Sequence, residues 1–303
     1  MLRILQILEA TEGGTRTHME HLLTGLKDEF DLHFAYSARR NTLYIKDVER
    51  YTEAGISCYE VPMVRHVSPL DDRKALHRLQ EVVRQVDPDV IHAHSSKAGY
   101  LARRLKRKKT CRLVYTPHCL YFPSRKQPFR LIYQWGEKFL SGNVDVFIAV
   151  SEDEKRNILK YVASESKIVR IDNGVEIPES VNTVREKRIL FPARAVPQKG
   201  WKWFLQVARI VVERDPEALF VFAGEGEDFF RLKKKAAACG LMEAVLLPGF
   251  ISDMDAEYRK ALVVAVTSRW EGQPYSVLEA MAYARPVVAF DIPGVNEIIE
   301  DGR

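Results

Sequence analysis

Cysteine pairs of the kind that form disulfide frameworks or metal sites are absent from this chain of 303 residues. Its four cysteines lie among apolar or strand-like neighbours and form no CxxC motif, so they predict reduced, partly buried thiols. Apolar runs such as Ala261–Val266 are far shorter than the roughly 20 residues that a membrane-spanning helix needs. Met1 leads directly into a strand-like run with no cleavage site for a signal peptide. We therefore expect a cytoplasmic protein that at most lies on the inner face of a membrane.

Two other sequence patterns are missing. The nearest approach to the dinucleotide-binding motif GxGxxG is Gly224-Glu225-Gly226, which has Phe229 in place of the third glycine. A dinucleotide-dependent oxidoreductase is therefore disfavoured. All eight histidines lie at or before His118, and no sequence-adjacent set of further ligands accompanies them. We expect no metal cofactor and predict a buried, hydrogen-bonded role for His92.

Acidic residues are absent between Val90 and Gly136, although the whole chain carries a net charge of only +5. Arg103 to Lys109 is expected to form the exposed end of a helix, and aromatic residues accompany the later cations. Cations beside aromatic rings are typical of proteins that dock on anionic lipid, so the 97–130 region predicts a membrane surface as partner. An aromatic core stripe with an ordinary solvated basic face is an equally open alternative. Nucleic acid is not expected, because no RNA-binding module is present. The cations are Lys97, Arg103, Arg104, Lys106, Arg107, Lys108, Lys109, Arg112, Arg125, Lys126 and Arg130.

The remaining composition is that of a globular protein, with 46% hydrophobic and 29% charged residues. Strand-like runs alternate with helical patterns from end to end, which predicts doubly wound parallel sheets. A polar, aperiodic linker at about residues 176–187 separates two such series. We therefore expect two Rossmann-like domains, residues 1–178 and 179–303, facing each other across a cleft. The predicted strands are 3–8, 31–37, 56–62, 90–94, 112–118, 144–151, 188–193, 219–223, 245–248, 261–267 and 286–290; the named helices are 17–26, 71–86, 129–140, 201–214, 229–239 and 275–284.

Three loops at strand ends carry residues suited to an anionic ligand that also bears hydroxyl groups. Gly13 and Gly14 follow the first strand, where backbone can approach a ligand at a helix start. Arg194 and Lys199 place two cations in the first strand–helix connection of the second series, where they can bind phosphate oxygens. A tight turn without a ligand would also explain Gly13 and Gly14, and a solvated loop would also explain Arg194 and Lys199.

The third loop runs from Glu271 to Glu279. Glu271 follows an apolar strand, and Pro274 suits the first position of a helix that contains Glu279. The two carboxylates are expected to lie apart along an elongated ligand, with the backbone N–H groups of Gly272 and Gln273 between them. A helix-terminal carboxylate and an unrelated surface carboxylate would explain each Glu singly.

Taken in order, these segments resemble family 4 of the retaining glycosyltransferases, which have the two-domain GT-B fold. The matching segments span nearly the whole chain. They are Gly13-Gly14, His94-Ser95-Ser96-Lys97-Ala98-Gly99, Thr116-Pro117-His118, Asn173-Gly174-Val175, Arg194 to Gly200, Gly224-Glu225-Gly226 and the pair Glu271 and Glu279.

The resemblance implies a role for each matched residue. Arg194 and Lys199 would bind the diphosphate of a UDP- or GDP-sugar, and Glu279 the ribose. Glu271, with Gly272 and Gln273, would bind the donor sugar, and His118 would contact it near the reacting carbon. Gly13 and Gly14 would lie beside the donor phosphates and the acceptor, and Glu225 and Gly226 near the base. The implied reaction retains anomeric configuration, uses no metal and acts on a glycan or lipid-linked acceptor.

Two departures from the family pattern leave alternatives open. Cys119 stands where the family often has glycine, and the chain ends at Arg303, so the second domain is expected to lack its usual last elements. A non-catalytic binder of nucleotide sugars or membranes remains an alternative function. A nucleotide-sugar epimerase on the same fold is a second one.

Overall fold

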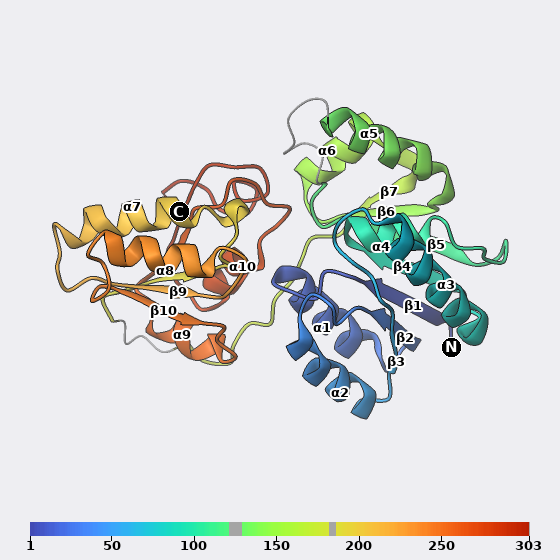
Figure 1. The fold of residues 1–303 in the computed structure, drawn as a ribbon, viewed down its shortest axis with the longest axis horizontal. Coiled ribbons are helices and arrows are strands. Elements are labelled where there is room, and N and C mark those ends of the chain that lie inside the picture. The colour runs from blue at the N-terminus through green and yellow to red at the C-terminus, as the bar shows by residue number, and fades with distance from the viewer. Residues whose placement is uncertain (121–128, 182–185, 303) are drawn as a thin grey trace. The chain divides into compact units, whose positions relative to one another are not determined.

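The computed structural model describes residues 1–120, 129–181 and 186–302, and the chain divides into two compact units, Met1–Asp172 and Asn173–Arg303 (Figure 1). The predicted boundary at residues 178 and 179 stays a prediction. Residues Arg125 and Lys126, with Tyr121 and Phe122, lie outside the described ranges. None of the described helices is both long and apolar enough to cross a bilayer.

Unit 1 is built on a parallel sheet of seven strands in the order β3-β2-β1-β4-β5-β6-β7. The chain adds strands outward from β1 to β3, then returns to the other side of β1 and continues with β4. The strands are β1 (Arg3–Leu8), β2 (Asp31–Tyr36), β3 (Ser57–Glu60), β4 (Val90–His94), β5 (Arg112–Thr116), β6 (Val146–Ala149) and β7 (Ile168–Arg170). The helices are α1 (Gly14–Leu26), α2 (Ile45–Glu53), α3 (Pro69–Val86), α4 (Ser95–Ala102), α5 (Phe129–Leu140) and α6 (Glu152–Tyr161).

Unit 2 is a smaller parallel sheet in the order β10-β9-β8-β11-β12, with the same reversal of direction next to its first strand. Its strands are β8 (Arg188–Pro192), β9 (Leu219–Ala223), β10 (Val245–Gly249), β11 (Val263–Val266) and β12 (Val287–Ala289). Its helices are α7 (Trp201–Val212), α8 (Phe229–Ala238), α9 (Met254–Lys260) and α10 (Tyr275–Ala282). The expected absence of its usual last elements stays a prediction.

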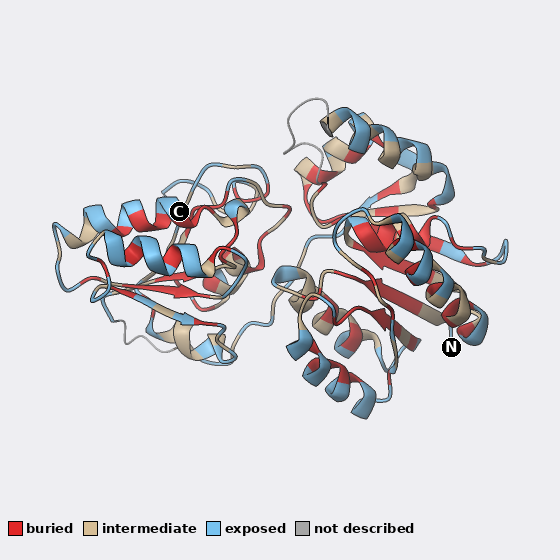
Figure 2. Cartoon of the chain, viewed as in Figure 1, coloured by how far each residue is buried: buried red, intermediate tan, exposed pale blue. Residues whose placement is uncertain are grey.

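Each sheet is covered on both faces because alternate strand residues point to opposite sides. In unit 2, Phe191 packs with α7 and α8, whereas its neighbour Leu190 packs with α9 and α10. In unit 1, Leu8 faces α1 and α2, whereas Ile7 faces the side of α3, α4 and α6. The central strands are therefore largely buried, while the outward helix faces are exposed (Figure 2). This arrangement confirms the predicted fold class of two doubly wound α/β domains.

One prediction about the basic region is wrong. Helix α4 ends at Ala102, and Arg103 is buried rather than part of an exposed helix end. Its guanidinium lies 2.7 Å from the Glu137 carboxylate and stacks over the ring of Tyr115 at 4.9 Å. Glu137 lies just beyond the acid-free stretch. Its pairing with Arg103 therefore neutralises a positive charge that has no acidic neighbour in the local sequence.

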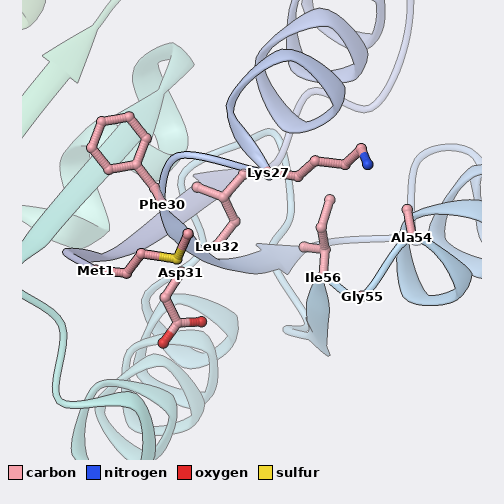
Figure 3. A pocket seen from close by; sticks show the side chains of 8 residues that line it. All are labelled: Met1, Lys27, Phe30, Asp31, Leu32, Ala54, Gly55 and Ile56. Atoms are coloured by element: carbon pink, nitrogen blue, oxygen red, sulfur yellow. The ribbon is translucent and has the colours of Figure 1, made fainter.

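A shallow hollow of about 300 Å³ lies in unit 1 where β1 and β2 begin. Figure 3 shows its lining, which includes Met1, Phe30 and Leu32. The hollow lies at the amino ends of the strands. Ligands of parallel sheets bind at the opposite edge, beyond the carboxyl ends, so this hollow has no part in the candidate site.

Candidate active site

In unit 2, the loops that follow β8 and β11 form one connected structure. The two strands are neighbours, and the reversal of strand order falls between them, which is where open α/β sheets bind ligands. The Arg269 N–H donates to the Gln198 carbonyl at 2.8 Å, and the Gln198 amide donates to the Trp270 carbonyl at 3.0 Å. Gly200 has a φ of 70°, and a Cβ there would lie 2.0 Å from the Thr267 carbonyl oxygen. Only glycine allows this approach, so the two loops are held in contact.

Lys199 and Glu271 meet across these loops. The Lys199 Nζ lies 2.5 Å from Glu271 Oε1, and the two side chains are 19% and 9% exposed. The structure thus joins a residue predicted to bind diphosphate to one predicted to bind the donor sugar. Arg194 is half-buried in the same loop as Lys199. The ion pair therefore lies at the switch point of the unit 2 sheet.

Glu279 lies within α10 and accepts a hydrogen bond from a residue that the sequence did not indicate. The Tyr258 hydroxyl, from α9, donates to Glu279 Oε2 at 2.6 Å. Burial raises the pKa of Tyr258 well above its usual value, so the hydroxyl stays a donor. Tyr258 therefore fixes one carboxylate oxygen of Glu279.

The loop of Gly272 and Gln273 is held from two sides. The Asn173 backbone N–H donates to Gln273 Oε1, and the Asn173 side-chain amide donates to the Gln273 carbonyl at 2.9 Å. On the other side, Gly294 has a φ of 81°, and a Cβ there would lie 2.2 Å from the Gly272 carbonyl oxygen. The backbone between Glu271 and α10 is thereby preorganised.

Glu225 and Gly226 are exposed in the loop after β9, beside the β8 loop. The Ala195 N–H donates to the Glu225 carbonyl at 2.8 Å. Gly226 has a φ of 153°, and a Cβ there would lie 2.7 Å from the Ala195 carbonyl oxygen. Apart from Glu279, which lies within α10, the residues predicted to bind donor in unit 2 thus belong to the connections that follow β8, β9 and β11 at the carboxyl edge of its sheet.

In unit 1, Gly13 and Gly14 are exposed where α1 begins, beside the reversal between β1 and β4. Gly13 adopts a φ of 63° as the residue before the helix. This conformation lets the helix start at Gly14, three residues earlier than the sequence predicted. Its first turn contains no acidic residue, although Glu12 lies just before the helix and pairs with Arg40.

A histidine cluster lies at the carboxyl edge of the same sheet. His92 is buried and bonded to the Thr116 hydroxyl at 2.8 Å, which confirms its predicted role. His94 Nδ1 lies 3.1 Å from His118 Nε2, and the His18 ring lies 4.4 Å from the His118 ring between centroids. Burial lowers the pKa of His92 to about 3 and holds the pKa values of His94 and His118 well below 6.5. These imidazoles are neutral at physiological pH.

The turn that carries His118 is strained and anchored by a buried carboxylate. His118 and Cys119 have φ values of 59° and 126°, which non-glycine residues rarely adopt. Glu154 accepts from the Cys119 N–H at 2.7 Å and the Val150 N–H at 2.9 Å. Burial raises the pKa of Glu154 to about 7. The sequence did not indicate Glu154, because its ordinary helical setting in α6 gives no sign of where the carboxylate points.

Models of two glycosyltransferase families match the chain. The model described as Glycosyltransferase Family 4 matches residues 12–179, and the model described as Glycosyl transferases group 1 matches residues 175–303. The chain is 28% identical over 273 residues to the UDP-Gal:alpha-D-GlcNAc-diphosphoundecaprenol alpha-1,3-galactosyltransferase of Escherichia coli, covering 83% of this chain and 70% of that one. It is 29% identical over 268 residues to the putative glycosyltransferase EpsD of Bacillus subtilis, covering 81% and 70%.

Solved structures share the fold across its full length. A TarM mutant of S. aureus in complex with Fondaparinux, alpha-GlcNAc-glycerol and UDP superposes with a TM-score of 0.80 at 16% identity, covering 99% of this chain and 88% of that one. The Anabaena protein HepE, in complex with UDP and glucose, gives 0.79 at 17% identity, covering 100% and 84%. The chain belongs to glycosyltransferase family 4 and is a GT-B glycosyltransferase that uses a nucleotide sugar.

Proposed function

We propose that this glycosyltransferase moves a sugar from a UDP-sugar to a lipid-linked glycan, with retention of anomeric configuration and without a metal ion. The Lys199–Glu271 pair at the switch point of unit 2 carries the proposal, because it joins a diphosphate-binding cation to a sugar-binding carboxylate. The E. coli relative named above supports the donor and acceptor class, since its name gives UDP-galactose and a diphosphoundecaprenol-linked sugar. GDP-sugars are the alternative donors.

The departure of the diphosphate is the step that needs electrostatic help. Breaking the bond between sugar and phosphate leaves negative charge on the phosphate oxygens, and fixed cations stabilise such developing charge. Arg194 and Lys199 fill this role, with the amino terminus of α7 directly after Gly200. Lys199 would exchange its bond to Glu271 for one to phosphate, which releases the carboxylate for the hydroxyls of the donor sugar.

The other donor contacts in the proposal are those that the family resemblance implies. Glu279, fixed by Tyr258, accepts from the ribose hydroxyls, and Glu225 and Gly226 lie near the base. Glu271 binds the donor sugar together with the backbone N–H groups of Gly272 and Gln273. In unit 1, His118 contacts the sugar near the reacting carbon, and Gly13 and Gly14 approach the phosphates and the acceptor.

Retention and metal independence belong to the same proposed mechanism. The leaving phosphate accepts the proton of the attacking hydroxyl on the same face of the sugar, so no paired carboxylates of the glycosidase type are required. Transfer is expected to continue in excess EDTA, and NMR of the product is expected to show the anomeric configuration of the donor. Loss of transfer in EDTA that Mg²⁺ or Mn²⁺ restores, or an inverted product, would contradict this mechanism.

A panel of donors with a GlcNAc-diphosphate lipid acceptor, analysed by mass spectrometry, tests the reaction itself. Calorimetric titration with UDP and GDP tests the site: Arg194→Ala and Glu279→Ala should each weaken binding by about 1.5–3 kcal/mol, the typical loss for a hydrogen bond to a charged group. Arg209→Ala and Glu213→Ala are matched controls, because these residues form an exposed pair on α7 and its end. UDP binding without transfer to any acceptor would favour a non-catalytic binder.

Membrane docking is the second part of the proposal, and the structure changes which residues support it. Most cations of the 97–130 region that the structure describes are engaged within unit 1. Lys97 is buried 2.6 Å from Asp72, and Arg107 and Arg112 share Asp145 at 3.2 Å each. These ion pairs reduce the net positive charge of the predicted basic patch, although the Arg112 side chain stays 69% exposed.

Helix α5 offers a better membrane surface. Its side chains Leu131, Ile132, Trp135 and Phe139 are 55%, 61%, 68% and 71% exposed, and the rings of Trp135 and Phe139 stack at 5.3 Å. Its acidic residue, Glu137, is held by Arg103, so the helix presents apolar and basic side chains without a competing free carboxylate. Helices of this kind lie in the interface of anionic bilayers. We assign the lipid surface as the occupant of this helix face.

Co-sedimentation with vesicles, with and without anionic lipid and at low and high salt, tests this assignment. The double substitution Trp135→Ala and Phe139→Ala should reduce binding at least tenfold, whereas Phe230→Ala, which removes a ring that is 78% exposed on α8, should not. Equal binding by the wild type and the double variant would refute the assignment.

A further inference from the structure

Three histidines of unit 1 converge from three separate elements. His18 comes from the second turn of α1, His94 from the end of β4, and His118 from the turn after β5. One ring nitrogen from each residue lies within 4.8 Å of those of the other two. His94 is fully buried, whereas His18 and His118 are partly exposed, so an ion from solvent can reach the group.

The nitrogen spacing is close to that of a metal centre. Zn²⁺ binds imidazole nitrogen at about 2.0–2.1 Å in tetrahedral sites, so two such ligands lie roughly 3.3 Å apart. The separation of 3.1 Å between His94 Nδ1 and His118 Nε2 matches this value. The third nitrogen, from His18, lies within 4.8 Å of both, so a bound ion would draw its ring toward the other two.

The outer contacts of His94 are also those of a metal ligand. His94 Nε2 lies 2.8 Å from Gln6 Oε1, and Gln6 is itself buried in β1. Metal-binding histidines usually donate their second ring N–H to such an oxygen, which fixes the tautomer. With Nε2 protonated, Nδ1 of His94 presents its lone pair toward His118. An ion would take the place of the hydrogen shared by the two rings, and the proton of His118 would move to its Nδ1.

We propose that His18, His94 and His118 bind one late first-row divalent ion, of the Zn²⁺ and Co²⁺ class, and that the bound ion inhibits sugar transfer. Three nitrogen ligands exclude Mg²⁺ and Ca²⁺, which prefer oxygen. Inhibition follows because the ion occupies the His118 nitrogen; this part rests on the proposed function. The site differs from a metal cofactor, since transfer itself proceeds without one.

Titration of EDTA-treated full-length protein with Co²⁺ tests the site by its visible absorption. We expect one equivalent per chain, with the intense absorption of a four-coordinate complex. His18→Ala and His118→Ala, which change partly exposed rings, should each weaken Co²⁺ binding at least tenfold. His77→Ala is the matched control, because that ring is 75% exposed on α3. Absence of saturable binding, or equal affinity in His18→Ala, would overturn the site.

Transfer assays separate the site from its consequence. Zn²⁺ should inhibit sugar transfer by the wild type and by the His77→Ala variant. The transfer rate of His18→Ala should be the same with and without Zn²⁺. One-to-one Co²⁺ binding in a chain that transfers no sugar would uphold the site and refute the proposed function. Transfer that Zn²⁺ does not inhibit, with the site occupied, would refute the coupling between them.

Discussion

Removal of the Tyr258 hydroxyl should weaken UDP binding although Tyr258 itself is too deeply buried to touch the nucleotide. The residue is 1% exposed, and its hydroxyl lies 2.6 Å from Glu279 Oε2. A hydrogen bond to a charged group contributes about 1.5–3 kcal/mol. Glu279 is only half-buried, so water compensates for part of this loss. We expect the Tyr258→Phe substitution to reduce UDP affinity by on the order of 1 kcal/mol, or about fivefold at about 1.4 kcal/mol per tenfold change.

Calorimetric titration of UDP into four proteins measures this coupling: the wild type, Tyr258→Phe, Glu279→Ala and the double variant. Tyr283→Phe is a matched control, since that ring stacks on Tyr258 at 5.4 Å and its hydroxyl has another partner, Asp255. The effect of Tyr258→Phe should disappear once Glu279 is alanine, because the two residues act through one bond. An undiminished effect in the Glu279→Ala background would refute the reasoning, as would unchanged affinity in Tyr258→Phe.

Three further substitutions test other parts of the structure. Arg103→Met should lower the free energy of unfolding of unit 1 by about 3–5 kcal/mol in urea titrations, because it leaves Glu137 without the partner of a buried ion pair; a change below about 1 kcal/mol, the scale of an exposed pair, would contradict that account. The pKa of Glu154, raised to about 7, means that protonation favours the folded state, so this residue's stabilisation is complete below pH 4.5 and is lost as the pH rises through 7. Glu154→Gln should flatten this loss of stability with rising pH. A melting temperature with the same pH dependence in the variant and the wild type would contradict this role of Glu154. Gly294→Ala should abolish the extra affinity of a UDP-sugar over UDP, because the new Cβ would displace the Gly272 carbonyl; equal discrimination between the two ligands in titration would contradict this role.

The parts of the fold that the sequence predicted well are those set by local hydrophobic pattern. Strands such as Arg3–Leu8 and Leu219–Ala223 are short, mostly apolar runs, and the structure has them at the predicted residues. The sequence pattern does not predict helix α2, IKDVERYTE, because few of its residues are apolar. Its position depends on Val48 and Tyr51 packing beneath α1, a tertiary contact that the local pattern does not specify.

The candidate site shows the same contrast between what the local sequence pattern predicts and what depends on tertiary contacts. The sequence identified Lys199 and Glu271 as separate functional residues, but their contact depends on the pairing of β8 with β11, which are remote in sequence. Tyr258 and Glu154 were missed because a buried tyrosine or glutamate in a helix looks ordinary until its partner is known. The prediction that Arg103 is exposed is wrong for a related reason. Glu137, which neutralises its charge, is 34 residues away in the sequence.

The separate packing of the two units also determines how the chain should unfold. Unit 1 has its apolar clusters around β1 and unit 2 has its own around β8, and no described cluster contains residues from both. Two cores of different size favour two melting steps, so one melting temperature would not describe the protein. A ligand bound by unit 2 alone would stabilise only that unit. At a concentration of a hundred times its dissociation constant, it would raise the free energy of unfolding of unit 2 by about 2.7 kcal/mol. Nucleotide and transition-metal ligands would therefore be distinguishable in one calorimetric scan by which step each one moves.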